Sequence, residues 1–310
     1  MRLFSVALKT LNELSFSTSS QICMNDKSLT SVCFSHIGKR INHEDNCFIN
    51  GTYLTSEMQK HMSDNHCYHF CDVGTTNVCL YAVSDGMGGH NAGEVASRIC
   101  VEKLSVAHKE LQHHSSIKDV VAYLQTVIAE INETVCDLSR KQDELKGMGA
   151  TLVLFVICGN ECAILNIGDS RAYYFINGKL IQITKDNTEG QRMLDFGLLT
   201  RKELAGFPAR KNLNRYIGFN QSGYVLQADE YYPTIDGGVM ILCSDGISDF
   251  VSDTRIAEIL DLEKNLGVAG KQLIDEAVAS QNADNATVML IPLRSFLYNS
   301  KYKEFREKKV

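Results

Sequence analysis

Five aspartates stand where apolar runs of the sequence begin or end, which is where buried strands enter or leave a sheet. They are Asp45 before NCFI, Asp85 after LYAVS, Asp169 after AILNIG, Asp245 after MILCS, and Asp284 close before ATVMLI. Glu44 adds a sixth carboxylate beside Asp45. Several of these acids could therefore converge on one edge of the core.

Converging carboxylates repel one another and cannot all stay ionised near a core without cations. Because the candidate ligands are oxygen atoms, the pattern favours Mg²⁺, Mn²⁺ or Ca²⁺ over zinc. Two such ions about 3.5–4 Å apart would lower the pKa of a shared water and hold it for in-line attack. Arg40, four residues before Glu44, could hold a phosphate through its guanidinium group.

Each of these residues also has a simpler interpretation. Asp-Gly is ordinary turn chemistry, and this alternative is strongest for Asp169, where IGDSRAYY fits a strand, a turn and a strand. It is weaker for Asp85 and Asp245, because a helical pattern follows each of them. Arg40 could equally form a structural ion pair with a carboxylate. Five such placements in one chain favour the metal site.

The surrounding patterns predict paired helices and hairpin-linked strands. Apolar residues follow helical spacing closely over 117–138 and more loosely over 95–104. Strands are predicted for TLVLFVI, CAILNIG, AYYFI and KLIQIT, with a hairpin turn at Asn177-Gly178, and later for YVLQA, GVMILCS and ATVMLI. Helical stretches follow Gly246. The combination predicts an α+β fold with helices packed outside antiparallel sheets.

The composition is that of a soluble globular protein, with 44% apolar and 22% charged residues. A net charge of -6 argues against a general nucleic-acid binder. The 11 cysteines follow no regular spacing, so we expect free thiols in a reducing compartment and not a disulfide scaffold. No stretch is apolar enough to span a bilayer, and the opening residues lack signal-peptide features. We therefore expect a cytoplasmic monomer with no membrane or nucleic-acid partner.

The chain reads as one domain with two tails. Residues 1–30 are a Ser/Thr-rich extension, residues 31–295 form the domain, and residues 296–310 are a basic tail. Residues 51–78 form a long insert within the domain, and residues 186–223 form a polar segment between strands.

Six motifs together carry a resemblance to a known family. GKRINHEDN, YAVSDGMGGHNAGEVAS, GMGATLVLF, LNIGDSRAYYF, MILCSDGISDF and ADNATVMLI occur in the order and approximate spacing of the type-2C metal-dependent protein serine/threonine phosphatases. The compact bacterial branch is the most similar. The resemblance implies a four-layer α-β-β-α sandwich, in which two packed antiparallel sheets are flanked by pairs of antiparallel helices. It also implies a site for two Mn²⁺ or Mg²⁺ ions at one end.

The resemblance assigns ligand roles to this chain residue by residue. Asp85 would bridge the two metals and Gly86 would offer its carbonyl. Asp245 and Asp284 would hold one of the ions.

Further roles follow from the same resemblance. Glu44 and Asp45 would act around the metals, partly through water. Arg40 would bind the substrate phosphate, and Asp169 matches an acid that helps to hold a third, weaker ion in some members. The implied reaction is hydrolysis of phosphoserine and phosphothreonine by a metal-bridged hydroxide. The implied partner is a phosphorylated protein, which could be the substrate of a cognate Ser/Thr kinase.

Two features depart from the family pattern. Animal members carry a histidine directly after Asp-Gly as the proposed general acid, whereas this chain has Met87. His90 follows, but it is more simply a turn or helix-entry residue, so the acid for the leaving group is unassigned. In the long insert, His66, Cys67, His69 and Cys71 could suggest a zinc site. Their alternating spacing lacks the usual C-x₂-C with a distant pair, so a polar strand or loop is favoured.

The segment 186–223 resembles the family's flap beside the active site. It carries six basic residues: Arg192, Arg201, Lys202, Arg210, Lys211 and Arg215. They could be solvated surface charge or a positive rim that attracts phosphorylated protein, and the two interpretations are compatible.

Two other functions are compatible with parts of the sequence. A catalytically inactive module that binds phosphoproteins would keep the fold, but it would be expected to have lost metal acids, and all of them are present. A nucleotide-binding enzyme could use GMGGH as a phosphate cradle, but the loop lacks the G-K-[ST] ending of a P-loop.

Overall fold

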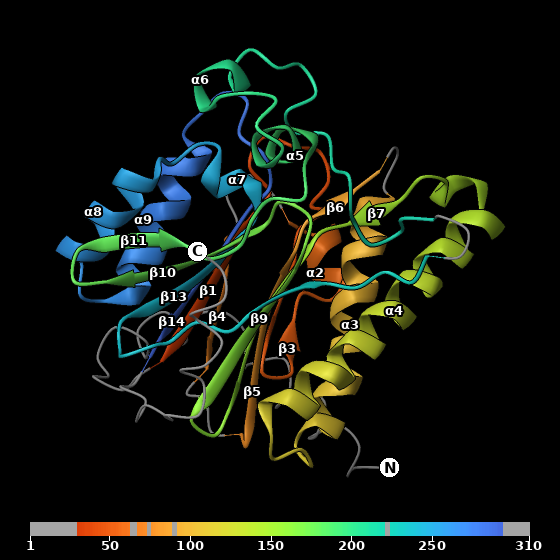
Figure 1. The fold of residues 1–310 in the computed structure, drawn as a ribbon, viewed down its shortest axis with the longest axis horizontal. Helices are drawn as coiled ribbons and strands as arrows, with labels where there is room; N and C mark the ends of the chain where they lie inside the picture. Colours follow the sequence, from red (N-terminus) through yellow and green to blue (C-terminus); the bar gives the residue numbers. More distant parts are fainter. Residues whose placement is uncertain (1–29, 63–66, 73–75, 89–91, 221–223, 294–310) are drawn as a thin grey trace, which may run out of the picture.

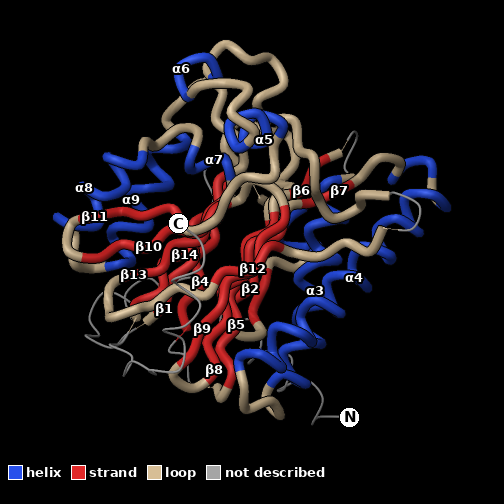
Figure 2. The backbone as a smooth tube through the Cα atoms, viewed as in Figure 1, coloured by secondary structure: helices blue, strands red, loops and turns tan. Residues whose placement is uncertain are grey.

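The computed structural model describes residues 30–62, 67–72, 76–88, 92–220 and 224–293. Two six-stranded antiparallel sheets lie face to face in this part of the chain, and helices cover both outer faces (Figure 1). Strands occupy the middle of the molecule and the long helices lie outside (Figure 2). This arrangement confirms the predicted four-layer α+β sandwich.

The first sheet, which we call sheet 1, contains both the first and the last strand. Its order is β11 (Lys179–Gln182), β10 (Arg171–Ile176), β13 (Val239–Cys243), β14 (Ala286–Pro292), β1 (Ser31–His36) and β4 (Cys67–Asp72). The order in sheet 2 is β12 (Asp229–Tyr231), β9 (Glu161–Ile167), β8 (Leu152–Cys158), β5 (Val78–Ser84), β2 (Asn46–Ile49) and β3 (Thr52–Tyr53).

Two helix pairs cover the sheets. Sheet 2 packs against α3 (Gly93–Leu111) and α4 (Ile117–Lys141), and sheet 1 packs against α8 (Asp253–Leu262) and α9 (Leu266–Val278). The shorter described elements are α2 (Ser56–Lys60), α5 (Glu189–Asp195), α6 (Arg201–Leu204), α7 (Asp245–Ser248), a 3-10 turn at Asp143–Leu145, and a small ladder of β6 (Gly86–Met87) with β7 (Gly149–Ala150).

The sequence of strand β5 is almost continuously apolar because both of its faces are buried. Its residues alternate between two cores, because successive side chains of a strand point to opposite faces. Leu80 and Ala82 pack under the helices, whereas Tyr81 and Val83 pack between the two sheets. A strand buried on both faces leaves no position for a solvated side chain until it ends.

The local signals for helices and turns agree with the structure. Ser116 accepts a hydrogen bond from the backbone N–H of Asp119 and caps α4, whose apolar stripe is buried as its spacing predicts. Asn177 and Gly178 have φ angles of 50° and 73°, as a tight type I′ hairpin turn between β10 and β11 requires.

One predicted strand is wrong. YVLQA (224–228) forms no strand, and β12 begins directly after it at Asp229. The Gln125 side chain of α4 pairs instead with both backbone groups of Ala228, donating to its carbonyl at 3.0 Å and accepting from its N–H at 2.9 Å. Leu226 and Ala228 are buried against the helical core, so the segment crosses the helices and does not join the sheet.

Some predictions fall on residues outside the described ranges. These are most of the extension 1–30, the tail 296–310, His66 and His90. None of the helices within the described ranges has the length and apolarity needed to cross a bilayer.

Candidate metal and phosphate site

The two central acids emerge from neighbouring layers of the sandwich. Strand β5 of sheet 2 ends at Ser84, so Asp85 is the first residue beyond it, and Asp245 is the first residue of α7 after β13 of sheet 1. Thr151 fixes the backbone at Asp85, accepting from its N–H at 2.9 Å through Oγ1 and donating its own N–H to the carbonyl at 2.8 Å. The carboxylate therefore projects from a rigid strand end.

The carboxyl groups at this end of the sheets lie close enough to perturb one another. Burial raises the pKa of Asp85 well above its ordinary value, and the charges of Asp45, Asp245 and Asp169 raise it further. Asp85 also shares a hydrogen bond with the Asp245 carboxyl group. Burial and the Asp245 charge likewise raise the pKa of Asp169 to about 7. The structure thus brings together four acids that are far apart in the sequence.

Asp45 is fully buried and held on one side only. Its Oδ2 accepts hydrogen bonds from Ser244 Oγ and Thr287 Oγ1, both at 2.7 Å. Its Oδ1 is buried and has no hydrogen-bond partner among the described residues. Burial raises the pKa of the Asp45 carboxyl group, against the effect of the two hydroxyl donors. An unpartnered buried carboxylate oxygen is costly unless a cation or water satisfies it.

A chain of hydroxyl groups continues from Asp45 to a buried histidine. Ser35 Oγ lies 2.7 Å from Thr287 Oγ1 and 2.8 Å from His43 Nε2. When Asp45 is ionised, Thr287 must donate to it, Ser35 must donate to Thr287, and His43 must donate through Nε2. Burial lowers the pKa of His43 to about 3, so the imidazole is neutral. Its Nδ1 then carries no proton and can only accept a hydrogen bond.

The remaining predicted residues lie around this acid cluster. Arg40 forms an ion pair with Asp284, whose Oδ1 accepts from the N–H of Asn285 at 2.8 Å. That pairing raises the pKa of Arg40, and Glu44 and Asp245 also contribute. The Glu44 carboxylate accepts a hydrogen bond from the Gly93 N–H at the start of α3. This acid therefore supplies a negative charge where the helix dipole favours one.

Gly86 is required by the close packing of the backbone at the site. A Cβ on Gly86 would lie 2.1 Å from the Gly93 carbonyl oxygen and 2.7 Å from that of Glu44. Its N–H donates to the Glu44 carbonyl at 3.1 Å. The glycine therefore allows the Asp85 turn, the Glu44 loop and the first turn of α3 to meet.

The donor set fits a hard divalent cation. All the converging side chains are carboxylates, and Asp45 Oδ1 needs a positively charged or hydrogen-bonding partner. In the described ranges, however, no three or more His, Cys, Asp or Glu side chains are already arranged to hold a metal ion. The physical reason is visible in two of them, because Asp284 is turned to Arg40 and Glu44 to helix α3. These two would have to change partners to become ligands.

The segment 187–214 projects over this end of the sheets and contains α5 and α6 (Figure 1). Its Lys211 forms an ion pair with Asp249, the residue that caps the C-terminus of α7. The Lys211 charge also opposes the rise in the pKa of Asp245, at the other end of the same short helix. This part of the flap is therefore tied to the element that carries a predicted ligand.

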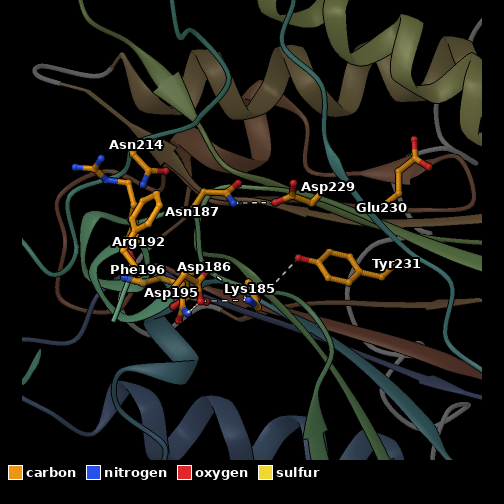
Figure 3. Close-up of a pocket in the computed structure, with 12 residues that line it drawn as sticks. Lys185, Asp186, Asn187, Arg192, Asp195, Phe196, Asn214, Asp229, Glu230 and Tyr231 are labelled. Atoms are coloured by element: carbon orange, nitrogen blue, oxygen red, sulfur yellow. Dashed lines mark hydrogen bonds and ion pairs between the residues drawn. The ribbon is translucent and has the colours of Figure 1, made fainter. Parts of the chain in front are cut away.

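A pocket of about 530 Å³ lies between α5 and β12 (Figure 3). Asn187 lies in its wall, donating through Nδ2 to Asp229 at 2.9 Å and accepting through Oδ1 from the Gly168 N–H at 2.9 Å. Asn187 therefore holds the turn that presents Asp169. The pocket's lysine and arginine, Lys185 and Arg192, are ion-paired within the protein.

The described part of the long insert provides a strand, the outcome that the spacing favoured. Cys67, His69 and Cys71 lie in β4, which pairs with β1 at the edge of sheet 1. His69 stacks on Phe34, with 4.3 Å between ring centroids. The expectation of free thiols is confirmed at the nine other described cysteines and is wrong at Cys71, which is disulfide-bonded.

Several positioning residues were missed by the sequence analysis. They are Ser35, His43, Ser244, Thr287 and Asn187. A weak signal was present for Thr287, since it is the one polar residue of the run ATVMLI, and buried polar groups need partners. The identity of those partners could not be read from the sequence.

A family model and individual known proteins both match this chain. A family model described as protein phosphatase 2C matches residues 59–265. The chain is 32% identical over 216 residues to the serine/threonine phosphatase stp of Listeria monocytogenes, covering 69% of this chain and 84% of that protein. It is 35% identical over 225 residues to the serine/threonine protein phosphatase PstP of Mycobacterium tuberculosis, covering 71% of this chain and 41% of that protein.

Solved structures are similar as well. The serine/threonine phosphatase of S. agalactiae superimposes with a TM-score of 0.70 at 26% identity, covering 84% of this chain and 98% of that one. The catalytic domain of PstP in complex with two manganese ions superimposes with a TM-score of 0.63 at 29% identity, covering 86% of this chain and all of that one.

Proposed function

The chain belongs to the protein phosphatase 2C family, and from this premise we propose that it is a metal-dependent hydrolase of phosphoserine and phosphothreonine in proteins. The observation that carries the proposal is the convergence of buried carboxyl groups around Asp45, whose Oδ1 has no partner in the part of the chain that the structure describes. Such a cluster is unfavourable without cations, and Mn²⁺ or Mg²⁺ would supply charge neutralisation and activate water for attack on phosphorus.

The proposed roles of the acids follow their positions. Asp85, whose carboxyl group shares a hydrogen bond with Asp245, would bridge two ions, with the Gly86 carbonyl beside it. Asp245 and Asp284 would hold one ion. Asp45, oriented by hydroxyl groups on its Oδ2, would direct its free Oδ1 toward the ions.

Arg40 would orient the substrate. Its side chain is 58% exposed, so it can leave Asp284 and hold two phosphate oxygens in a bidentate contact. Glu44 would act from its position at the start of α3, partly through water. Asp169 would contribute to a third, weaker ion site together with Asp245.

The experiment is hydrolysis of p-nitrophenyl phosphate and of a phosphothreonine peptide with Mn²⁺, with Mg²⁺ and with EDTA. We expect metal-dependent phosphate release that is lost in Asp245→Ala. No release with either metal, from protein whose circular dichroism and cooperative melting show that it is folded, would overturn the proposal.

That outcome would favour a catalytically inactive module that binds phosphoproteins. The two functions also differ in their response to Mn²⁺. An enzyme should show a higher melting temperature and turnover together, whereas an inactive module would show at most the higher melting temperature.

The same family membership supports several finer proposals. Residues 31–295 would form the phosphatase domain, with residues 51–78 as an insert and 186–223 as a flap, flanked by an extension at 1–30 and a basic tail at 296–310. The protein would act as a monomer on substrates of a cognate Ser/Thr kinase. A cytoplasmic location is supported by the nine free cysteines, although Cys71 is an exception.

A further inference from the structure

The basic residues of the flap fall into two groups. Three form ion pairs: Arg192 with Glu189, Lys211 with Asp249, and Arg215 with Asp229. The other three are exposed, and their side chains form no ion pair or hydrogen bond with the described residues: Arg201, Lys202 and Arg210. In the first group, Lys211 and Arg215 tie the flap to α7 and β12, and Arg192 pairs within α5. The second group is available to a partner.

The acid that follows two of these cations in the sequence is engaged in a helix cap. Arg201 and Lys202 are the first two residues of α6, and Glu203 is the third. The Glu203 carboxylate closes a capping box with Thr200, accepting from its backbone N–H at 2.8 Å and its hydroxyl at 2.7 Å. Glu203 is therefore engaged with the helix start and does not neutralise its two neighbours through an ion pair.

The third cation belongs to the same projection. The Arg210 carbonyl accepts from the Gly190 N–H in the first turn of α5 at 3.2 Å. Figure 1 places α5 and α6 above the end of the sheets at which α7 begins with Asp245. The Lys211–Asp249 ion pair fixes the residue after Arg210 to α7. We call Arg201, Lys202 and Arg210 the flap tip.

We propose that the flap tip binds an acidic stretch of the phosphoprotein substrate, next to the phosphorylated residue in the active site. This inference rests on the proposed function and adds a substrate preference to it. The chain has a net charge of -6 and its catalytic end is rich in carboxylates, so an acidic substrate needs a local cationic surface to approach. Arginine also binds carboxylates in a bidentate geometry.

The alternative partner with the same charge is nucleic acid. Nucleic-acid binders commonly neutralise about 6–10 phosphates, whereas the flap tip offers three cations on an acidic protein. A short acidic protein segment therefore matches the surface better than a nucleic-acid backbone.

The test compares two triple variants with the same change in charge. Arg201→Gln/Lys202→Gln/Arg210→Gln removes the positive charges of the flap tip. Lys109→Gln/Lys118→Gln/Lys179→Gln removes three exposed lysines that lie outside the flap and form no ion pairs with the described residues. Each protein is assayed with Mn²⁺ on a phosphothreonine peptide flanked by glutamates, on the same peptide flanked by glutamines, and on p-nitrophenyl phosphate, at low and high salt.

We expect the flap-tip variant to lose about tenfold in kcat/KM on the acidic peptide, mainly through KM, and to lose most of the salt dependence. Its activity on the neutral peptide and on p-nitrophenyl phosphate should stay within about twofold of the wild type. The control variant should behave as the wild type does. Equal loss on both peptides, or no loss on the acidic one, overturns the proposal.

A direct binding measurement separates this inference from the proposed function. If the wild type hydrolyses none of the three substrates, the proposed function has failed. The flap tip is then judged by fluorescence anisotropy with a labelled, unphosphorylated glutamate-rich peptide and with a single-stranded oligonucleotide. Weaker binding of the acidic peptide by the flap-tip variant alone supports the proposal. An effect on the oligonucleotide alone contradicts it.

Discussion

Thr287 donates a hydrogen bond of 2.7 Å from its Oγ1 to Oδ2 of Asp45, across 242 positions of the sequence. The bond joins the last strand of sheet 1 to the loop before β2 of sheet 2. It fixes which oxygen of Asp45 is engaged within the protein and which remains for a ligand. Neighbours of this kind orient metal ligands and tune their affinity.

Removing that donor should weaken metal binding. We expect Thr287→Val to lower Mn²⁺ affinity by about 10–100-fold, the usual effect of losing a group that orients a ligand. Isothermal titration calorimetry measures the affinity directly. Thr134→Val is the control, because Thr134 donates to the Glu130 carbonyl on the exposed face of α4. Unchanged Mn²⁺ affinity in Thr287→Val would show that Asp45 needs no such support.

The substitution Asp85→Asn should separate activity from folding. We expect hydrolysis of p-nitrophenyl phosphate to fall by more than about 10³-fold, because the proposed bridging charge is lost. In EDTA the melting temperature should not fall, since the substitution removes a carboxyl group whose pKa is raised by burial and by repulsion from neighbouring carboxylates. Turnover like that of the wild type would exclude Asp85 as a bridging ligand.

Asp169 should make the metal-free protein less stable as the pH rises. Its pKa is raised from 3.8 to about 7, so the folded state binds a proton more tightly than the unfolded state does between these values. The stability associated with that proton is complete at low pH and is lost as the pH rises toward 7.

The corresponding experiment is urea unfolding of the wild type and of Asp169→Asn in EDTA at pH 5 and pH 8. Because Asn does not ionise, the variant should gain roughly 2–3 kcal/mol relative to the wild type over this interval. A constant difference between the two proteins would mean that Asp169 is not perturbed. Asp137→Asn, on an exposed ion pair, is the control.

Gly86→Ala should destabilise the fold as well as the site. The new Cβ would lie 2.1 Å from the Gly93 carbonyl oxygen, which forces the first turn of α3 away from the Asp85 turn. We expect a loss of about 1–3 kcal/mol in the free energy of unfolding, the usual cost of overpacking. Gly206→Ala is the control, because its Cβ would meet only the Glu203 carbonyl at 3.7 Å. An equal effect of the two substitutions would contradict the close packing at Gly86.

The ion pair between Lys211 and Asp249 should stabilise the flap and have little effect on the stability of the whole protein. Lys211→Met is expected to accelerate amide hydrogen exchange in the flap between residues 189 and 212, measured by mass spectrometry, because it unties the flap from α7. Global stability should change by less than about 1 kcal/mol, since the pair is partly exposed. Lys264→Met, at the weaker pair with Asp261 in α8, should leave flap exchange unchanged. Identical flap exchange in wild type and Lys211→Met would rule out the tether.

The sequence by itself determined most helices and strands, and it placed the acids at the ends of strands. Helical spacing in α4, the Asn177-Gly178 turn and the apolar strands that stop at Asp85 and Asp245 are local features, and local geometry follows from residue type and period. The order of six motifs indicated the protein family, and the family predicted the four-layer sandwich. Only at YVLQA did the local pattern mislead, because Gln125 of a distant helix supplies the hydrogen bonds that a neighbouring strand would have made.

The tertiary structure decided which groups face one another. The two hydroxyl partners of Asp45 come from the end of β13 and the start of β14, and Arg40 pairs with an acid 244 positions away. Two of the three ion pairs of the flap, Lys211 with Asp249 and Arg215 with Asp229, also join different segments of the chain. Such pairings depend on the packing of two sheets and their helices. Hydrophobic packing sets these distances, and the period of a sequence carries no information about contacts between its remote parts.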